Sequence, residues 1–150
     1  MLNEESLVSA ISGINSVHII GAGLNKERTA HTAVGEISQR GWRVVPVHPR
    51  DAGATVSGSP IRSELEDGVE LELVVLFLAP ERARKVVKKL LLKNLHHPPL
   101  IWYQPGAEDE TSINWLEEGR FKLNDTSPRH INWELDCAIE LSKSLKKIGL

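Results

Sequence analysis

The sequence VHIIGAGLNKERT, residues 17–29, decides the fold. Its first four residues form an apolar run, which predicts a short buried strand. Gly21 and Gly23 follow at once, and the mixed polar and apolar segment Thr29–Gln39 predicts a helix that Gly41 ends. A strand, a glycine-rich turn and a helix in this order begin a βαβ unit.

The same alternation continues along the rest of the chain. Further strands are predicted at Val44–Val47, Leu71–Leu78, Leu100–Gln104 and Phe121–Leu123, and further helices from Pro80 onward and over Glu108–Gly119. The strands are continuously apolar, which is typical of a sheet covered on both faces. We therefore expect an α/β fold of three layers, Rossmann-like, with a parallel sheet of about five strands and helices on both faces.

The segments outside this alternation are expected to be small. The loop Pro49–Ser63 is rich in Gly, Ser and Pro, and we expect a small strand at Ser59–Ile61 and a helical turn around Ser63–Asp67. Helices are also expected at residues 4–12 and 131–148, packed on a core of about residues 16–124.

The length and composition favour one domain and exclude several classes of protein. The 150 residues fit a single domain, and the net charge of −2 gives no basic field for nucleic acid. One cysteine excludes a disulfide framework and a Cys-based zinc site. The longest apolar run is too short to span a bilayer, and the N-terminus lacks a signal-peptide pattern. We expect a protein of the reducing cytoplasm, with no metal and no membrane partner.

The C-terminal segment leaves the oligomeric state open. The pattern over 131–148 is amphipathic, with Leu135, Ile139 and Leu145 on one side. We expect this helix to pack on its own domain, and a homodimer formed through it is the alternative.

The residues after the first strand form the first candidate binding loop. An open parallel sheet binds ligands outside the carboxyl ends of its strands. Gly21 and Gly23 would let a backbone approach a ligand, and the helix that follows offers free N–H groups to a phosphate. Arg28 adds a guanidinium, and Thr29 could cap the helix. Lys26 stands where a dinucleotide fingerprint has its third glycine, and a plain turn without a ligand is the alternative.

The residues after the second strand carry positive charge. An NAD site usually has an acidic residue here, which binds the ribose hydroxyls. This chain has His48, Pro49 and Arg50 instead. A cation suits a phosphorylated ribose, as in NADP or in the 3′-phosphate of coenzyme A. A solvated loop cation is the alternative for Arg50.

Two further turns lie at the same predicted edge. Leu78 and Ala79 precede Pro80, which suits the first turn of a helix. Gln104 ends the fourth strand before Pro105 and Gly106, and its side chain could form hydrogen bonds with a ligand amide. Ordinary turn chemistry is the alternative at both places.

Taken together, four motifs carry a resemblance to a known family. They are Gly21-Ala22-Gly23 with Arg28, the run WRVVPVHPR at 42–50, Phe77 with Pro80-Glu81, and the run WYQPG at 102–106. In this order and spacing they resemble the small stand-alone CoA-binding proteins. Those proteins are similar to the CoA-binding domain of the succinyl-CoA synthetase α subunit, which has a Rossmann-like fold. The resemblance covers the chain from about Ser16 to Leu123.

The resemblance implies coenzyme A (CoA) as the ligand and assigns the loops to its parts. Residues 21–24 with Arg28 and Thr29 would face the diphosphate and adenosine. Pro49 and Arg50 would lie near the adenine and the 3′-phosphate, and residues 78–80 with Gln104 would line the adenine and pantetheine path. The candidate binding residues are Gly21, Ala22, Gly23, Leu24, Arg28, Thr29, His48, Pro49, Arg50, Leu78, Ala79, Pro80, Gln104 and Gly106.

The chain departs from the family pattern at three places. His48 replaces a usual Asn, and Leu78 and Ala79 stand where one or two arginines are usual. The segment 124–129 replaces an Asp-Arg-Cys-Pro type ending, and the single Cys137 is expected to be a buried structural thiol.

No catalytic constellation is found in the sequence. Ser127, His130 and Asp136 lie close in sequence, but none is on a nucleophile elbow. The expected function is therefore the non-catalytic binding of CoA or an acyl-CoA. The alternatives are a redox-sensing domain that binds NADP or NAD, and an interaction module whose ligand site has decayed.

Overall fold

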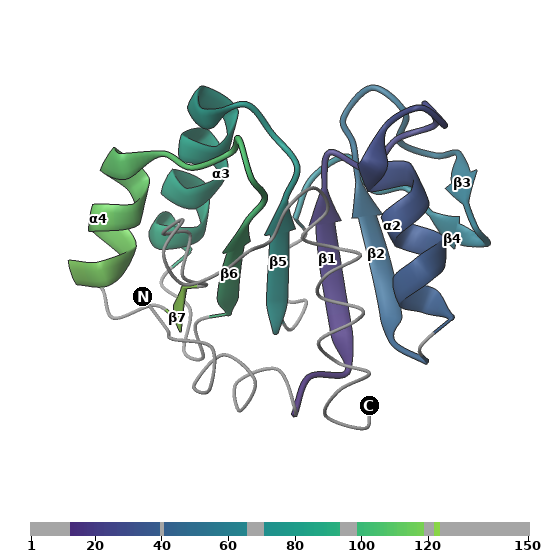
Figure 1. Cartoon of the computed structure of the whole chain (residues 1–150), viewed down its shortest axis with the longest axis horizontal. Coiled ribbons are helices and arrows are strands. Elements are labelled where there is room, and N and C mark those ends of the chain that lie inside the picture. Colours follow the sequence, from purple (N-terminus) through teal and green to yellow (C-terminus); the bar gives the residue numbers. More distant parts are fainter. Residues whose placement is uncertain (1–12, 40, 66–70, 94–98, 119–121, 124–150) are drawn as a thin grey trace.

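The main sheet of the protein is parallel throughout. The structure, a computed structural model, describes residues 13–39, 41–65, 71–93, 99–118 and 122–123. The strand order is β2-β1-β5-β6-β7, and each neighbouring pair is parallel. The strands are β1 (Ser16–Ile20), β2 (Arg43–Val47), β5 (Leu73–Leu76), β6 (Leu100–Tyr103) and the two-residue β7 (Lys122–Leu123). The carboxyl ends of the four longer strands all lie along the same end of the sheet (Figure 1).

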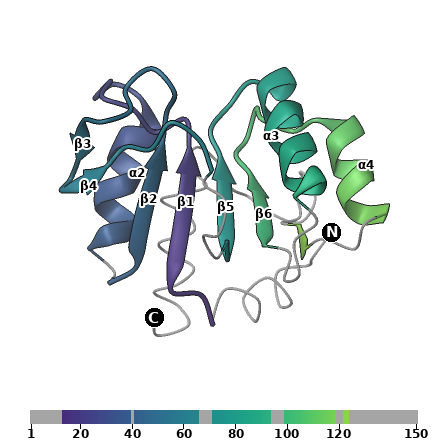
Figure 2. The ribbon, with the colours of Figure 1, turned by 180° about the vertical axis from the view of Figure 1, so that it is seen from behind.

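Helices cover both faces of this sheet. Helix α2 (Thr29–Ser38) lies on one face, and α3 (Pro80–Leu92) and α4 (Glu110–Glu118) lie side by side on the other. Figures 1 and 2 show the two faces in turn. The predicted three-layer α/β fold, with its Rossmann-like parallel sheet, is confirmed.

Burial on both faces explains why the strands are continuously apolar. Alternate residues point to opposite sides of a strand. Ile19, Val75 and Trp102 pack in the cluster under α2, whereas Leu76 and Tyr103 pack in the cluster under α3 and α4. All five side chains are almost fully buried. A polar residue at any of these positions would therefore face the apolar core rather than water.

The loop after β2 differs in part from its prediction. The small strand predicted at Ser59–Ile61 is found as β4 (Ser59–Pro60), and it pairs with an unpredicted antiparallel partner, β3 (Thr55–Val56). Between them Ser57 and Gly58 have positive φ angles of 48° and 81°, as the two residues of a type I′ hairpin do. Residues 63–65, the described part of the expected helical turn, are not helical: the chain bends at Ser63 and Glu64 and is irregular at Leu65.

Other predictions concern residues outside the described ranges. These are the helices at 4–12 and 131–148, the homodimer alternative, the departure at 124–129, Cys137 and the rejected triad. They stay predictions. Along the described parts of the chain, no helix combines the length and apolar character needed to cross a membrane.

Candidate ligand-binding site

A large cavity lies where the strand order reverses. The chain passes from β1 to β2 on one side and later enters β5 on the other side of β1. Open α/β sheets bind ligands at such a switch point, outside the carboxyl ends of the strands. The cavity there has a volume of about 1840 Å³. Small-molecule sites usually have about 300–1,000 Å³, so this cavity has room for a large coenzyme.

The cavity gathers most of the residues that the sequence predicted for the site. Those that line it are Gly21, Gly23, Arg28, Thr29, His48, Pro49, Arg50, Leu78, Ala79, Gln104 and Gly106. Three predicted residues do not line it. Ala22 is fully buried in the core under α2, Leu24 is nearly half exposed at the surface, and Pro80 begins α3.

The prediction that Thr29 caps α2 is wrong. Arg28 is the N-cap residue, and its side chain makes no capping hydrogen bond. Thr29 is the first helical residue, one position after the N-cap, so its side chain does not occupy the capping position. The first turn of α2 also lacks an acidic residue. The N-terminus of α2, which borders the cavity, therefore has neither a side-chain cap nor a carboxylate to offset its positive end.

The two glycines of the first loop are required by the packing of the chain itself. Gly21 has a φ of +101°, and a side chain there would overlap the carbonyl oxygen of Phe77. A side chain at Gly23 would overlap the Asp51 carboxylate and lie 2.8 Å from Cδ2 of His48. The absence of side chains thus lets the ends of three strands meet, in addition to any approach by a ligand.

An acidic residue that the prediction did not use organises this corner. Oδ2 of Asp51 accepts a hydrogen bond from the backbone N–H of Leu24 at 2.9 Å. The same oxygen lies 3.7 Å from Nδ1 of His48, and Oδ1 lies 3.9 Å from Nε of Arg50. Asp51 therefore ties the glycine loop to the loop after β2. No local pattern indicates this contact, because it joins loops 27 residues apart.

The cavity is lined by more positive than negative side chains. Its six cations are Arg28, Arg50, Arg82, Lys85, Lys89 and Lys93, against the carboxylates of Asp51 and Glu64. Lys89 pairs with Glu64 at 3.7 Å. Within the described ranges, Arg28, Arg82 and Lys85 have no ion pair. The surplus of positive charge would attract an anionic ligand.

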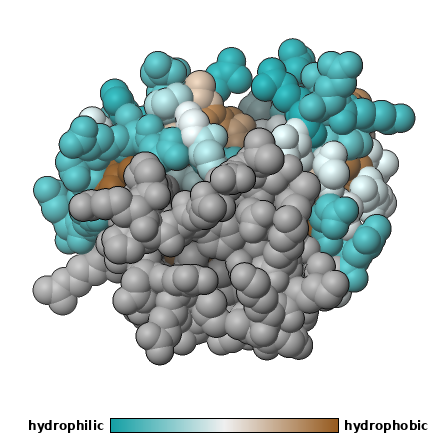
Figure 3. All heavy atoms as spheres, in the orientation of Figure 1, coloured by the Kyte–Doolittle hydropathy of each residue, from teal (hydrophilic) through white to brown (hydrophobic). Residues whose placement is uncertain are grey.

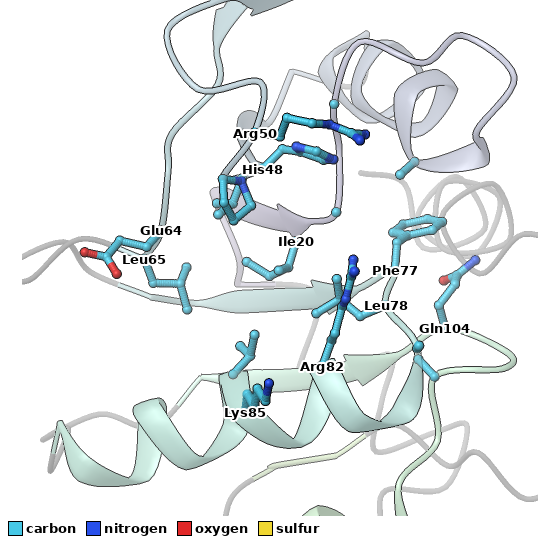
Figure 4. A pocket seen from close by; sticks show the side chains of 18 of the residues that line it. Ile20, His48, Arg50, Glu64, Leu65, Phe77, Leu78, Arg82, Lys85 and Gln104 are labelled. Atoms are coloured by element: carbon cyan, nitrogen blue, oxygen red, sulfur yellow. The ribbon is translucent and has the colours of Figure 1, made fainter.

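Three of these cations come from α3 and were missed by the sequence analysis. Ala83, Val87 and Leu90 face the core, which places Arg82, Lys85 and Lys89 on the flank that borders the cavity. Figure 4 shows Arg82 and Lys85 on the cavity side of the helix. The prediction considered strand ends only, although the helical spacing of the apolar residues could have indicated this flank. Arg82 lies about one helical turn after Leu78 and Ala79, the two positions where the family pattern usually has arginine.

Gln104 is the most unusual polar group of the site. The residue is 5% exposed, and neither its amide nitrogen nor its amide oxygen has a hydrogen-bond partner. Its backbone N–H donates to the carbonyl oxygen of Leu76 at 3.2 Å, which extends the pairing of β6 with β5. Figure 4 shows the amide beside the Phe77 ring.

Figure 3 shows hydrophilic side chains on both sides of a small hydrophobic patch, along the edge to which the strands point. Among the described residues, no three His, Cys, Asp or Glu side chains come together as a metal site would require.

The family of the chain follows from its sequence over this same region. Residues 15–129 match the model of the CoA binding domain family, so the chain belongs to that family. No curated protein matches the sequence.

Several solved structures share the fold. A protein from Thermus thermophilus is 24% identical with a TM-score of 0.71, and the match covers 81% of this chain and 90% of that one. A conserved hypothetical protein from Pyrococcus furiosus is 21% identical with a TM-score of 0.62, over 73% and 91% of the two chains. A hypothetical protein from Pyrococcus horikoshii is 20% identical with a TM-score of 0.70, over 81% and 83%.

Proposed function

We propose that this protein binds CoA or an acyl-CoA and catalyses no reaction of its own. The observation that carries the proposal is the cationic cavity at the switch point of a CoA binding domain. CoA carries a diphosphate and a 3′-phosphate, so it needs positive groups at two separate places. The uncapped N-terminus of α2 with Arg28 suits the diphosphate. Arg50 suits the 3′-phosphate.

The non-catalytic part of the proposal rests on the sequence. No nucleophile, general base and orienting residue occur there in an arrangement that an enzyme uses. The protein would then carry, store or sense its ligand, or deliver it to a partner.

A calorimetric titration with four ligands tests the proposal. CoA, dephospho-CoA, NADP and NAD are titrated into the full chain under identical conditions. CoA is expected to bind most tightly, and dephospho-CoA more weakly because it lacks the 3′-phosphate. Binding of NADP or NAD without binding of CoA would favour the redox-sensing alternative. Binding of none of the four ligands would favour the alternative of an interaction module whose ligand site has decayed.

The substitution Arg50→Gln tests the role of the 3′-phosphate. The Arg50 side chain is 81% exposed, so water screens its contact and the effect is moderate. We expect CoA to bind about fivefold to tenfold more weakly, whereas dephospho-CoA changes little. Arg43→Gln is the matched control, because Arg43 is exposed at the other end of β2 and does not line the cavity. Equal losses for the two ligands would refute the assignment of Arg50.

The substitution Arg82→Gln tests whether α3 contributes to the site. Arg82 and Lys88 are both exposed on this helix, but only Arg82 lines the cavity. We expect Arg82→Gln to weaken CoA binding about threefold to fivefold, and more at low salt than at high salt. Lys88→Gln is expected to leave binding unchanged. The same loss in both variants would mean that α3 acts only through the general field of the protein.

A further inference from the structure

The two oxygens of the Asp51 carboxylate differ in their hydrogen bonds. Oδ2 accepts from the backbone N–H of Leu24 at 2.9 Å. Among the described residues, no donor lies within hydrogen-bond distance of Oδ1, and the cation beside it, Nε of Arg50, is 3.9 Å away. The side chain is only 19% exposed, and it lines the cavity. Because polar groups shielded from water usually have a partner, Oδ1 is an acceptor that a ligand could use.

The histidine next to this carboxylate does not supply the missing donor. Nδ1 of His48 lies 3.7 Å from Oδ2 of Asp51. The same nitrogen accepts a hydrogen bond from the backbone N–H of Asp51 at 3.3 Å. A ring nitrogen that accepts a hydrogen bond carries no proton to donate. His48 therefore orients the backbone of Asp51 and leaves its carboxylate available to a ligand.

The packing of the two loops fixes the position of the carboxylate. Leu24 belongs to the glycine loop after β1 and Asp51 to the loop after β2, and these two strands are neighbours in the sheet. The carboxylate comes so close to the glycine loop that a side chain at Gly23 would overlap Oδ2. The cavity thus presents a fixed anionic acceptor directly beside the guanidinium of Arg50.

We propose that Oδ1 of Asp51 accepts a hydrogen bond from the ribose hydroxyl next to the phosphate that Arg50 binds. This inference rests on the proposed function, in which Arg50 holds the 3′-phosphate of CoA. The ribose of CoA has a free 2′-hydroxyl on the carbon next to this phosphate. A hydroxyl beside a phosphate matches an acceptor beside a cation, so the two residues together recognise the two groups.

Asp51 would then restrict the class of ligand in two ways. A deoxyribose has no hydroxyl at this place, so its binding would leave Oδ1 shielded from water and without a donor. A second phosphate in place of the hydroxyl would bring two negative charges together. The site therefore selects ribonucleotides that carry one phosphate and one free hydroxyl on the ribose.

Two ligands and two variants test this inference. Adenosine 3′,5′-bisphosphate and its 2′-deoxy analogue are titrated by calorimetry into the full-length wild type, Asp51→Asn and Glu64→Gln. The wild type is expected to bind the ribonucleotide about tenfold more tightly, because the analogue leaves a charged acceptor unpaired. In Asp51→Asn this preference should fall below about twofold, since asparagine can still accept from Leu24 while its amide nitrogen replaces Oδ1. Glu64→Gln removes the other carboxylate of the cavity and should keep the preference.

The ratio of the two affinities separates recognition of the hydroxyl from a purely structural role. If Asp51 only ties the two loops together, Asp51→Asn will change both affinities equally and preserve their ratio, which would overturn the inference. A preference below about twofold in the wild type would overturn it too, and that comparison does not depend on the folding of a variant. Binding of CoA without binding of the bisphosphate would also overturn it, because the ribose end would not hold the ligand. Failure of the wild type to bind CoA would instead reject the proposed function itself.

Discussion

Replacing Gly21 by alanine is expected to lower the free energy of unfolding by about 3 kcal/mol or more. Two costs add at this position. The φ of +101° is strained for any residue with a side chain. The new Cβ would also overlap the carbonyl oxygen of Phe77.

Neither neighbour of Gly21 can easily move to relieve this overlap. The N–H of Gly21 donates to Val47 at 2.8 Å, and the N–H of Phe77 donates to Ile20 at 2.9 Å. These bonds join the ends of three adjacent strands at the edge of the cavity. A shift of the Phe77 carbonyl would therefore disturb the sheet as well as the site.

Urea unfolding of Gly21→Ala beside Gly53→Ala separates the two costs. Gly53 has a φ of +93°, but a side chain there would meet no atom within 4 Å. Its substitution should cost only about 1–2 kcal/mol, which is the price of the backbone conformation. If both variants lose the same stability, the contact with Phe77 does not limit the fold, and the packing explanation for Gly21 is wrong.

The sheet could be predicted from the sequence because its signals are local. The apolar runs 17–20 and 44–47 lie within β1 and β2, and the run 100–104 extends one residue beyond β6. Each run must bury both faces, so its own composition reveals it. The hairpin partner Thr55–Val56 could not be found in this way, because two residues carry no period.

The site could be predicted only as far as strand ends determine it. Gly23, Arg50 and Gln104 were expected together because the carboxyl ends of parallel strands share an edge. Asp51 and Arg82 were not expected at the site, because Asp51 acts through a contact between loops and Arg82 lies within a helix. Contacts of this kind depend on where the loops and helices pack, and no local pattern encodes that.

Replacing Asp109 by asparagine is expected to remove most of the fall in the free energy of unfolding that the domain shows below about pH 4. Asp109 is buried directly before α4, and Arg84 of α3 donates to both its oxygens, with Nε 3.2 Å from Oδ1 and 3.0 Å from Oδ2. The backbone N–H of Ser112 donates to Oδ2 at 2.9 Å, so the carboxylate also caps α4. The Ser112 hydroxyl lies 2.8 Å from the Tyr103 hydroxyl, which extends the network to β6.

The hydrogen bonds from Arg84 are the main cause that lowers the pKa of Asp109 from 3.8 to about 2. Burial opposes this shift, and the bonds from Ser112 support it. Because the pKa is lower in the folded than in the unfolded state, the charged form stabilises the fold above about pH 4. This stabilisation is lost as the pH falls from about 4 toward 2. Its size is on the order of 2 kcal/mol, and salt reduces it because Arg84 is nearly half exposed.

Urea unfolding between pH 7 and pH 2 of Asp109→Asn and Asp109→Ala measures this contribution. Asparagine keeps the helix cap but has no charge to lose, so this variant should lack the wild type's fall in stability below pH 4. Alanine removes the cap as well and should cost about 1 kcal/mol more at every pH. Glu110→Gln, at the exposed next residue, should retain the wild-type pH dependence. If Asp109→Asn retains it too, another carboxylate is responsible and the Arg84 pair stabilises little.

The effect of Asp109 on stability should extend to ligand binding through a short turn. The backbone of Ala107 donates to the carbonyl oxygen of Gln104 at 2.8 Å, and Asp109 anchors the end of the same turn to α3. Loss of the anchor would free the turn that begins at Gln104, which lines the cavity. At pH 7, where the folded state still predominates, we therefore expect Asp109→Ala to weaken binding of CoA, whereas Glu110→Gln should leave it unchanged. Unchanged binding of CoA in Asp109→Ala would mean that the turn holds its position without Asp109.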